Sequence, residues 1–495
     1  MNVQRTSTQA PALRVLFVVS EAHPLIKTGG LGDVAGSLPQ ALTKLGCDVR
    51  ILLPAYPTCV ERAGALKPVA SLSIPGSVDQ VTLLAGRLPG TRVKIWLVDY
   101  PPAYDRTGNP YLDPNGRPWD DNAERYALLA RVATAIAQKR AKLDWQPDVV
   151  HCHDWQTGLV PALLAQEVQR PASVFTIHNL AYQGLFPHTT FVNLDLPPSL
   201  WAFDALEFHG LLSFIKGGLV YADKLTTVSP TYADEIQTPE FGGGLDGLLR
   251  QRAADLIGIL NGIDERTWNP AKDPHLAARY SPRRLAAKAD NKQALQRAFG
   301  LPVATDIPLI GMVGRLVEQK GIDQVLLALP ALMQRPVQIV VLGRGEAHYE
   351  QALLAFAAQH AEKIRVRIGY DEALAHQIEG GADMFLMPSR FEPCGLNQLY
   401  SLRYGTVPIV RRVGGLADTV VDASTSTLAA GSATGIAFDG DDAADLLSAM
   451  DRALTLYQNK TAWSQLIQTG MAQNFSWDAS ARHYLDLYTK LTQRA

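Results

Sequence analysis

The sequence lacks several features that would assign it to a specialised class of protein. Its 495 residues contain only four cysteines (Cys47, Cys59, Cys152 and Cys394), which are widely spaced and form no CxxC pair. This argues against a disulfide framework or a zinc ribbon and predicts a reducing compartment. No apolar run approaches the ~18 residues that a membrane-spanning helix needs. The first ten residues, MNVQRTSTQA, lack the apolar centre of a signal peptide. We therefore expect a cytoplasmic protein without a membrane partner.

An excess of charge of one sign is also missing. The chain has 46 Lys+Arg against 48 Asp+Glu, a net charge of −2, and no block rich in lysine or arginine. Nucleic acid is therefore not expected as a partner, and a neutral partner such as a sugar fits the composition. The composition leaves the oligomeric state open.

Short β-branched runs alternate with helical patterns along almost the whole chain. Continuous apolar strands separated by helices indicate an α/β protein with parallel sheets covered on both faces. Helical stretches are expected at 122–139, 322–334 and 372–379. The strand candidates lie at 13–20, 49–55, 93–99, 148–154, 173–179 and 224–229, and then at 307–314, 337–343, 364–369, 382–389 and 407–412.

The length and a gap in the strand series predict two domains. No strand is expected between about 238 and 306, and we place the boundary near residue 262. The pattern predicts two Rossmann-like, doubly wound domains, 1–262 and 263–475, facing each other across a deep cleft. The final stretch, 476–495, carries apolar residues at helical spacing and is expected to pack back onto the first domain.

The stretch IKTGGLGDVAG (26–36) follows the first strand. It is not a Walker loop, because Lys27 precedes the glycines. It is not a dinucleotide fingerprint either, since its spacing is GxGxxxG. A tight strand-to-helix turn with a solvated lysine remains as the simple interpretation. GGLGD at 29–33 recurs as GGLAD at 414–418, also between a strand and a helix.

The stretch GRLVEQKG (314–321) places two cations at the start of a helix that begins near Ile322. Arg315 and Lys320 are unfavourable beside the partial positive charge of a helix N-terminus unless an anion offsets them. A diphosphate is the favoured anion, because arginine supplies a fork and lysine a point charge. A solvated surface cluster with Glu318 is the alternative.

The stretch PSRFEPCGLNQ (388–398) places Glu392 and several backbone amides after a strand. Amides there can hold hydroxyls or phosphate oxygens, and the carboxylate can bind sugar hydroxyls or stabilise cationic charge. The alternative is a capped turn with Glu392 in a surface ion pair.

Two first-domain strands end in HCHDWQ (151–156) and TIHN (176–179). The H-x-H-D pattern is compatible with a metal site in a hydrolase. It is equally compatible with hydrogen-bonding residues around a polyol, with Trp155 as a stacking face.

Taken together, the motifs resemble those of bacterial glycogen synthases and plant starch synthases. KTGGLGDV, HDWQ, TIHN, NGID, GRLVEQKG, SRFEPCGL and GGLADTV occur in the order of that family and cover nearly the whole chain. The resemblance implies a retaining glucosyltransferase of the B-type fold, whose first domain serves the acceptor and whose second binds the donor. It implies transfer of glucose from ADP-glucose to the non-reducing end of an α-1,4-glucan (glycogen), with no cofactor and no required metal.

The resemblance also implies roles for individual residues. Lys27, Gly29 and Gly30 would lie over the donor diphosphate and sugar, while Arg315 and Lys320 would bind the diphosphate. His178 would contact the transferred glucose and Glu392 its hydroxyls, so that cleft closure completes the site. Further substrate-binding positions implied by the match are Asp33, Asp154, Trp155, Asn179, Asn261, Cys394, Gly395, Leu396 and Asn397.

Two positions depart from related patterns. Asn397 stands where the family commonly has threonine, which puts a phosphate contact there in doubt. Tyr400 stands where the wider group of retaining transferases has a second glutamate. No clear carboxylate pair for a double displacement is present, so we expect same-face attack by the acceptor. Three alternatives stay open: UDP-glucose as donor, a metal-dependent hydrolase using HCHD, and a non-catalytic glucan-binding protein.

Overall fold

The computed structural model describes residues 12–493, so the stretch examined for a signal peptide lies outside the described residues. The chain divides into two compact units. The first runs to Val228 and includes Ile236–Ile259 and the segment from Trp477 on, while the second comprises Ser229–Glu235 and Leu260–Ser476. Within 12–493, no helix has the length and apolar character needed to cross a membrane.

The first unit is built on a sheet with the strand order β12-β11-β7-β6-β1-β2-β5-β4-β3. The sheet is parallel from β12 to β5, as expected, and the pairings of β4 with β3 and β5 make this edge antiparallel. Most of β3 is exposed, and an antiparallel edge tolerates solvent on one face. β12 also falls in the interval where no strand was expected. The strands are β1 (Arg14–Val18), β2 (Asp48–Pro54), β3 (Lys67–Leu72), β4 (Val81–Arg87), β5 (Lys94–Asp99), β6 (Val149–His153), β7 (Ala172–Ile177), β11 (Lys224–Thr227) and β12 (Leu256–Gly258).

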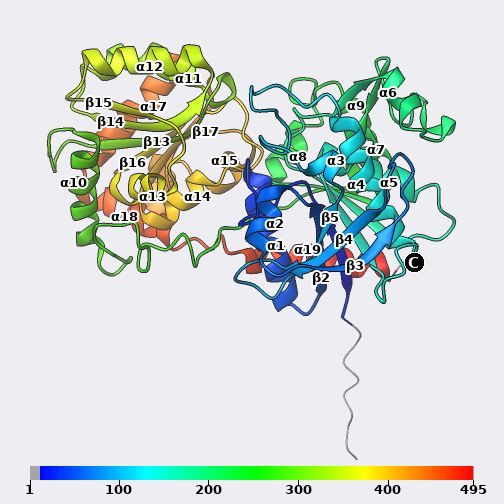
Figure 1. Cartoon of the computed structure of the whole chain (residues 1–495). Coiled ribbons are helices and arrows are strands. Elements are labelled where there is room, and N and C mark those ends of the chain that lie inside the picture. Colours follow the sequence, from blue (N-terminus) through cyan, green and yellow to red (C-terminus); the bar gives the residue numbers. More distant parts are fainter. Residues whose placement is uncertain (1–11, 494–495) are drawn as a thin grey trace, which may run out of the picture. The chain divides into compact units, whose positions relative to one another are not determined.

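Helices cover this sheet, and the last helix of the chain is one of them. α19 (Trp477–Thr492) lies beside α1 (Gly30–Lys44) (Figure 1) and buries Tyr484, Leu487 and Tyr488. A small separate sheet has the order β8-β10-β9. Its strands are β8 (Leu185–Pro187), β9 (Glu207–Phe208) and β10 (Leu211–Ser213). The other helices are α2 (Pro57–Ala63), α3 (Pro101–Tyr104), α4 (Asn122–Ala137), α5 (Leu159–Leu164), α6 (His188–Asn193), α7 (Phe214–Tyr221) and α9 (Asp246–Gln251).

The second unit is built on a parallel sheet with the order β15-β14-β13-β16-β17-β18. Numbered within the unit this is 3-2-1-4-5-6, the order of a Rossmann fold. The strands are β13 (Leu309–Leu316), β14 (Gln338–Gly345), β15 (Ile364–Ile368), β16 (Met384–Met387), β17 (Val407–Arg411) and β18 (Ile436–Phe438).

Apolar side chains are buried on both faces of this second sheet. One core cluster joins the sheet to α11 (Ile322–Leu332), α12 (Ala347–Gln359), α17 (Ala443–Gln458) and α18 (Lys460–Met471). The cluster on the other face includes residues of α10 (Lys288–Phe299), α13 (Glu372–Gly381) and α15 (Gly414–Thr419). The remaining helices are α8 (Pro230–Glu235), α14 (Asn397–Tyr404) and α16 (Thr425–Ala430).

Each large sheet has a point where the strand order reverses. In the first unit β1 lies between β2 and β6, and in the second unit β13 lies between β14 and β16. Ligands of open α/β sheets bind beyond the carboxyl ends of the strands at such switch points. The loops after β1 and β6, and those after β13 and β16, are therefore the places to examine. They carry the motifs singled out in the sequence.

Candidate functional site

A buried carboxylate organises the loop after β1. Glu21 is 3% exposed, and it accepts hydrogen bonds from the Thr28 amide, the Thr28 hydroxyl (3.0 Å), the Gly29 amide (3.4 Å) and the Tyr111 hydroxyl (3.1 Å). Burial raises the pKa of Glu21, and the hydrogen bonds oppose this. Glu21 and Tyr111 were not predicted from the sequence. The available signal was the position of Glu21, a carboxylate directly after a buried strand.

The KTGG turn leaves the start of α1 open. The Lys27 Nζ lies 2.8 Å from Asp33 Oδ1, and both side chains are partly exposed. A methyl group added at Gly29 or Gly30 would meet no heavy atom of the described residues within 4 Å. The first amides of a long helix beside a lysine form an environment that suits an anion.

Asp154 fixes the loop after β7. Its Oδ1 accepts the backbone N–H groups of His178 (2.7 Å) and Asn179 (3.4 Å). The backbone of Asp154 has φ 55°, an uncommon value for a residue other than glycine. Burial raises the pKa of Asp154 to about 7, and the charge of Glu21 adds to the rise. Asp154 therefore positions the TIHN loop through its carboxylate.

The histidines of the two strand ends contact one another rather than forming a metal site. His178 Nε2 lies 3.0 Å from His153 Nδ1. Both ring nitrogens of His151 are engaged, Nδ1 with the Tyr488 hydroxyl and Nε2 with the Thr176 hydroxyl, each at 2.6 Å. Among residues 12–493 no group of three or more histidine, cysteine or acidic side chains has the arrangement of a metal site. The contacts of His151 disfavour the HCHD hydrolase interpretation, because that ring has no nitrogen left for a metal.

Trp155 is packed into the first unit. Its ring is 8% exposed and lies edge-on to Tyr126 at 5.1 Å between centroids, with Phe186 at 5.8 Å and Phe214 at 6.2 Å. The face that was expected to stack on a polyol is therefore largely covered by protein.

In the second unit, Lys320 and Glu392 meet at the switch point. The Lys320 Nζ donates to Glu392 Oε2, which also accepts from the Ser389 hydroxyl at 3.0 Å. Glu392 is 6% exposed, so the surface-pair interpretation of this residue is wrong. Arg315 is exposed at the end of β13, and its guanidinium donates to Gln319 Oε1 at 3.0 Å. Two cations and a buried carboxylate are thus gathered between neighbouring strand ends.

Hydrogen bonds hold the two loops of this cluster together. The Arg390 amide donates to the Gln319 carbonyl (2.8 Å), and the Gln319 side chain donates to the Phe391 carbonyl (3.1 Å). The Arg390 guanidinium forms a bidentate pair with Asp323 at 2.6 and 2.8 Å. Such cross-links preorganise a site.

The FEPCGLN segment presents the start of α14. Gly395 has φ 71°, where glycine is favoured, and Leu396 is the N-terminal cap residue of the helix. The Asn397 side chain donates to the Val313 carbonyl at 2.7 Å, so that it links α14 to β13. Burial raises the pKa of the Cys394 thiol to about 12, which keeps it protonated, and Asn261 hydrogen-bonds to it. Asn261 lies in the second unit, in its long segment Leu260–Ser476.

The GGLAD turn (414–418) packs against the backbone of the FEPCGLN segment. The Gly415 amide donates to the Glu392 carbonyl at 3.0 Å, and a methyl group at Gly415 would lie 2.1 Å from the Cys394 carbonyl. The Gly414 amide donates to Glu235 Oε1 at 2.8 Å. The glycine pairs of the two GGL(G/A)D sequences therefore differ in function: Gly29 and Gly30 leave open space, while Gly414 and Gly415 permit close packing.

Packing explains why a tyrosine stands at position 400. Its ring stacks on Trp268 at 3.7 Å between ring centroids, and Trp268 also stacks on His376 at 3.7 Å. The Tyr400 side chain is 6% exposed. A position that carries a glutamate in the wider transferase group is here part of the core beneath α14.

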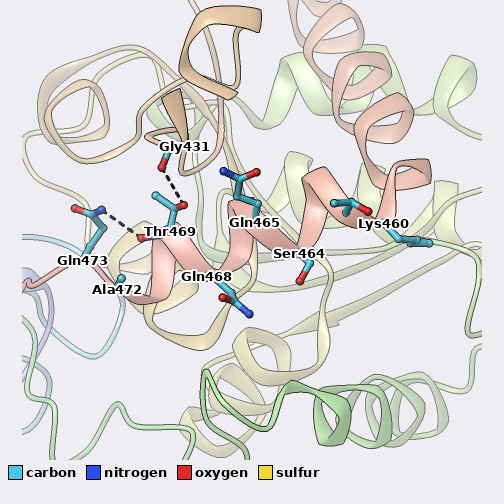
Figure 2. Close-up of a pocket in the computed structure, with 9 residues that line it drawn as sticks. Gly431, Lys460, Ser464, Gln465, Gln468, Thr469, Ala472 and Gln473 are labelled. Atoms are coloured by element: carbon cyan, nitrogen blue, oxygen red, sulfur yellow. Dashed lines mark hydrogen bonds between the residues drawn. The ribbon is translucent and has the colours of Figure 1, made fainter. Parts of the chain in front are cut away.

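A hollow of about 870 Å³ runs along α18 in the second unit (Figure 2). Its lining is mainly hydroxyl and amide side chains, including Ser464, Gln465 and Gln468. It contains none of the residues that the motifs single out.

The two Rossmann-like units, with cations, helix starts and a buried carboxylate at their switch points, define a glycosyltransferase of the B-type fold. Residues 14–251 match the model of the starch synthase catalytic domain, and residues 297–468 match that of glycosyl transferases group 1. The chain belongs to the bacterial glycogen synthase family. It is 60% identical to glycogen synthase 1 of Methylococcus capsulatus over 96% of each chain, and 57% identical to glycogen synthase of Thioalkalivibrio sulfidiphilus over 97% of this chain and 100% of that one.

A solved structure shares the fold over nearly the whole length. It is the catalytic domain of starch synthase IV from Arabidopsis thaliana, bound to ADP and acarbose. The TM-score is 0.88 at 32% identity, covering 97% of this chain and 100% of that one. The expected resemblance, the fold class and the glycosyltransferase activity are thereby confirmed.

Proposed function

We propose that this chain transfers glucose from ADP-glucose to the non-reducing end of an α-1,4-glucan such as glycogen, with retention of configuration. The observation that carries the proposal is the group of Arg315, Lys320 and Glu392 at the switch point of the second unit. The relative from Arabidopsis, bound to ADP and acarbose, supports ADP rather than UDP as the nucleotide. A reducing cytoplasmic compartment fits the four free, buried cysteines.

The diphosphate is assigned to the cations. Arg315 is exposed and can offer a fork of donors, while Lys320 supplies a point charge. Lys27 and the first amides of α1, beside Gly29 and Gly30, are assigned to the same donor substrate. These groups stabilise the negative charge that develops on the diphosphate as ADP departs.

The transferred glucose is assigned to His178 and Glu392. The half-buried ring of His178 has its Nε2 edge occupied by His153, so the Nδ1 edge is the one available to a sugar. Glu392 and the amides near Gly395 and Leu396 would hold sugar hydroxyls, and Glu392 would oppose positive charge on the ring. The remaining assigned substrate-binding positions are Asp33, Asp154, Asn179, Asn261, Cys394 and Asn397, whereas the buried Trp155 ring supports the first unit.

The proposed chemistry is a same-face substitution. The bond from the anomeric carbon to the β-phosphate oxygen breaks, and the acceptor 4-hydroxyl oxygen bonds to that carbon. Its proton passes to the departing phosphate oxygen. Glu392 Oε2 is already hydrogen-bonded to Lys320 and Ser389, which suits electrostatic support better than nucleophilic attack. A trapped glucosyl–Glu392 adduct would contradict this mechanism.

One assay tests the function. Purified protein is incubated with glycogen primer and radiolabelled ADP-glucose or UDP-glucose, with EDTA and no added metal. Transfer from ADP-glucose is expected, and transfer from UDP-glucose alone would correct the donor. Glycogen binding without transfer from either donor would indicate a non-catalytic protein. Stoichiometric zinc or iron without transfer would favour the hydrolase.

A further inference from the structure

The contact between His153 and His178 indicates which ring nitrogen of each histidine carries the proton. His153 Nδ1 and His178 Nε2 are 3.0 Å apart, a hydrogen-bonding distance. Burial lowers the pKa of His178 to about 3 and that of His153 well below its ordinary value, so both rings are neutral at neutral pH. One ring must therefore donate and the other accept.

The two rings differ at their opposite edges. The His153 side chain is fully buried, with Phe17 and His151 each 4.1 Å away between ring centroids. Its Nε2 has no hydrogen-bond partner among the described residues. His178 is only half-buried, and its Nδ1 lies on the edge away from His153.

This difference decides between the two arrangements. If His178 donated, neutral His153 would have to carry its proton on Nε2, as a buried N–H without an acceptor. If His153 donates, the same position holds only an unprotonated nitrogen. Buried N–H groups without partners are rarer in proteins than under-satisfied acceptors.

We propose that His153 donates its Nδ1–H to His178 Nε2 and thereby fixes His178 as the tautomer with its proton on Nδ1. His153 is then a positioning residue: it makes the open edge of His178 a hydrogen-bond donor toward a sugar hydroxyl oxygen. This consequence rests on the proposed function, whereas the tautomer itself does not. His153 and Asp154 are adjacent, so one strand end sets both the proton on His178 and the backbone that carries it.

The tautomer can be measured without substrate. In protein labelled with 15N at histidine, long-range 1H–15N correlations distinguish Nδ1–H from Nε2–H rings. His178→Gln identifies the signals of His178 among the 11 histidines. We expect a protonated Nδ1 in the wild-type protein, and a protonated Nε2 would overturn the proposal.

Two variants at position 153 separate donation from packing. In His153→Asn the side-chain amide can replace the Nδ1–H donor, while His153→Leu removes it. We expect the asparagine variant to keep the Nδ1–H tautomer and a kcat/KM within about threefold of wild type. The leucine variant should convert His178 to the Nε2–H form, which neutral imidazole favours in water, and lower kcat/KM by about 5- to 10-fold, the scale of one hydrogen bond.

His151→Asn is the matched control. His151 lies on the same face of β6, but its hydrogen bonds go to Thr176 and Tyr488 and not to His178, so its replacement should leave the tautomer unchanged. Equal tautomers and equal kcat/KM in the asparagine and leucine variants would overturn the proposal. Absence of glucosyl transfer in the wild type would count against the proposed function, while the spectrum still decides the tautomer.

Discussion

Lys320 and Glu392 form their ion pair at a point where a phosphate would compete for the lysine. The pair is partly shielded, with side-chain exposures of 22% and 8%. Because Glu392 also accepts from Ser389, it keeps a hydrogen bond when Lys320 turns to another anion. Lys320 can therefore leave Glu392 to bind a phosphate, while the buried Glu392 carboxylate keeps a hydrogen-bond partner.

We predict that Lys320→Ala lowers kcat/KM for ADP-glucose by about 10- to 150-fold, since a charge-assisted hydrogen bond contributes ~1.5–3 kcal/mol. Initial rates at saturating glycogen measure this. Lys272→Ala, at an exposed lysine of the same unit, is the control and should leave kcat/KM unchanged. An unchanged value for Lys320→Ala would place this lysine in a solvated surface cluster.

Burial of Asp154 lowers the free energy of unfolding by an amount that depends on pH. Its pKa in the folded protein is raised to about 7, so the folded state holds a proton that the unfolded state loses from about pH 4 upward. Stability therefore falls as pH rises from ~4 to ~7 and is level above that. We predict that Asp154→Asn is more stable than wild type at pH 8 by about 1–3 kcal/mol, and that the difference disappears near pH 4. Urea unfolding at the two pH values measures it.

Asp223→Asn is the contrasting control in the same unit. The Arg170 guanidinium and the Ser173 amide hold the pKa of Asp223 below its ordinary value against the effect of burial. Its contribution is present at neutral pH and is lost as pH falls, so this variant should lose stability at pH 8. Equal responses of the two variants would contradict the assignment for Asp154.

The charged residues proposed to bind the donor could be predicted from the sequence, whereas the contacts that support the site could not. Arg315, Lys320 and Glu392 could be predicted because short motifs place them just after buried strands. The partners of Glu21 could not, because Tyr111 is 90 residues away and meets it only in the folded unit. The same holds for His153, whose role depends on a contact across two strands.

At the scale of elements, the strands that could be predicted from the sequence are those with a long, continuous apolar run. β13 and β14 are apolar because both sheet faces are covered, and each strand expected from such a run is present. β3 was missed because it lies at an exposed edge and its apolar residues do not form a continuous run. β12 was missed because three residues are too short for any periodicity.

The two glycine turns at helix starts permit a matched test. We predict that Gly415→Ala destabilises the second unit by about 1–3 kcal/mol, because its methyl group would collide with the Cys394 carbonyl. Gly30→Ala should fold as stably as wild type, since a methyl group there meets nothing within 4 Å, but it should lower kcat/KM by about 10-fold by obstructing the donor. Thermal unfolding and initial rates measure the two effects. Loss of stability in Gly30→Ala, together with unchanged stability and lower activity in Gly415→Ala, would contradict these assignments.

At the scale of the whole molecule, the first unit is discontinuous in sequence. α19 returns to it from the end of the chain, places Tyr488 against His151, and lies along α1. A unit assembled in this way needs both ends of the polypeptide.

We predict that a chain ending at Ser476 loses stability in the first unit, because the buried faces of Tyr484, Leu487 and Tyr488 are removed. Hydrogen exchange followed by mass spectrometry resolves the units: protection of β1 and β6 should fall by at least about tenfold while β13 and β14 keep theirs. A chain ending at residue 493 retains α19 and is the control. Unchanged protection of β1 and β6 in the shorter chain would contradict this role of α19.

The position of α19 also determines the order in which the units are completed on the ribosome. Domains usually fold in the order of their synthesis, N-terminal first. Here every residue of the second unit has been translated before Trp477, whereas the first unit waits for the last helix of the chain. A nascent chain paused before that helix holds a finished second unit and a first unit with the apolar face of α1 uncovered. That face stays exposed to solvent until α19 has been synthesised and packs against it.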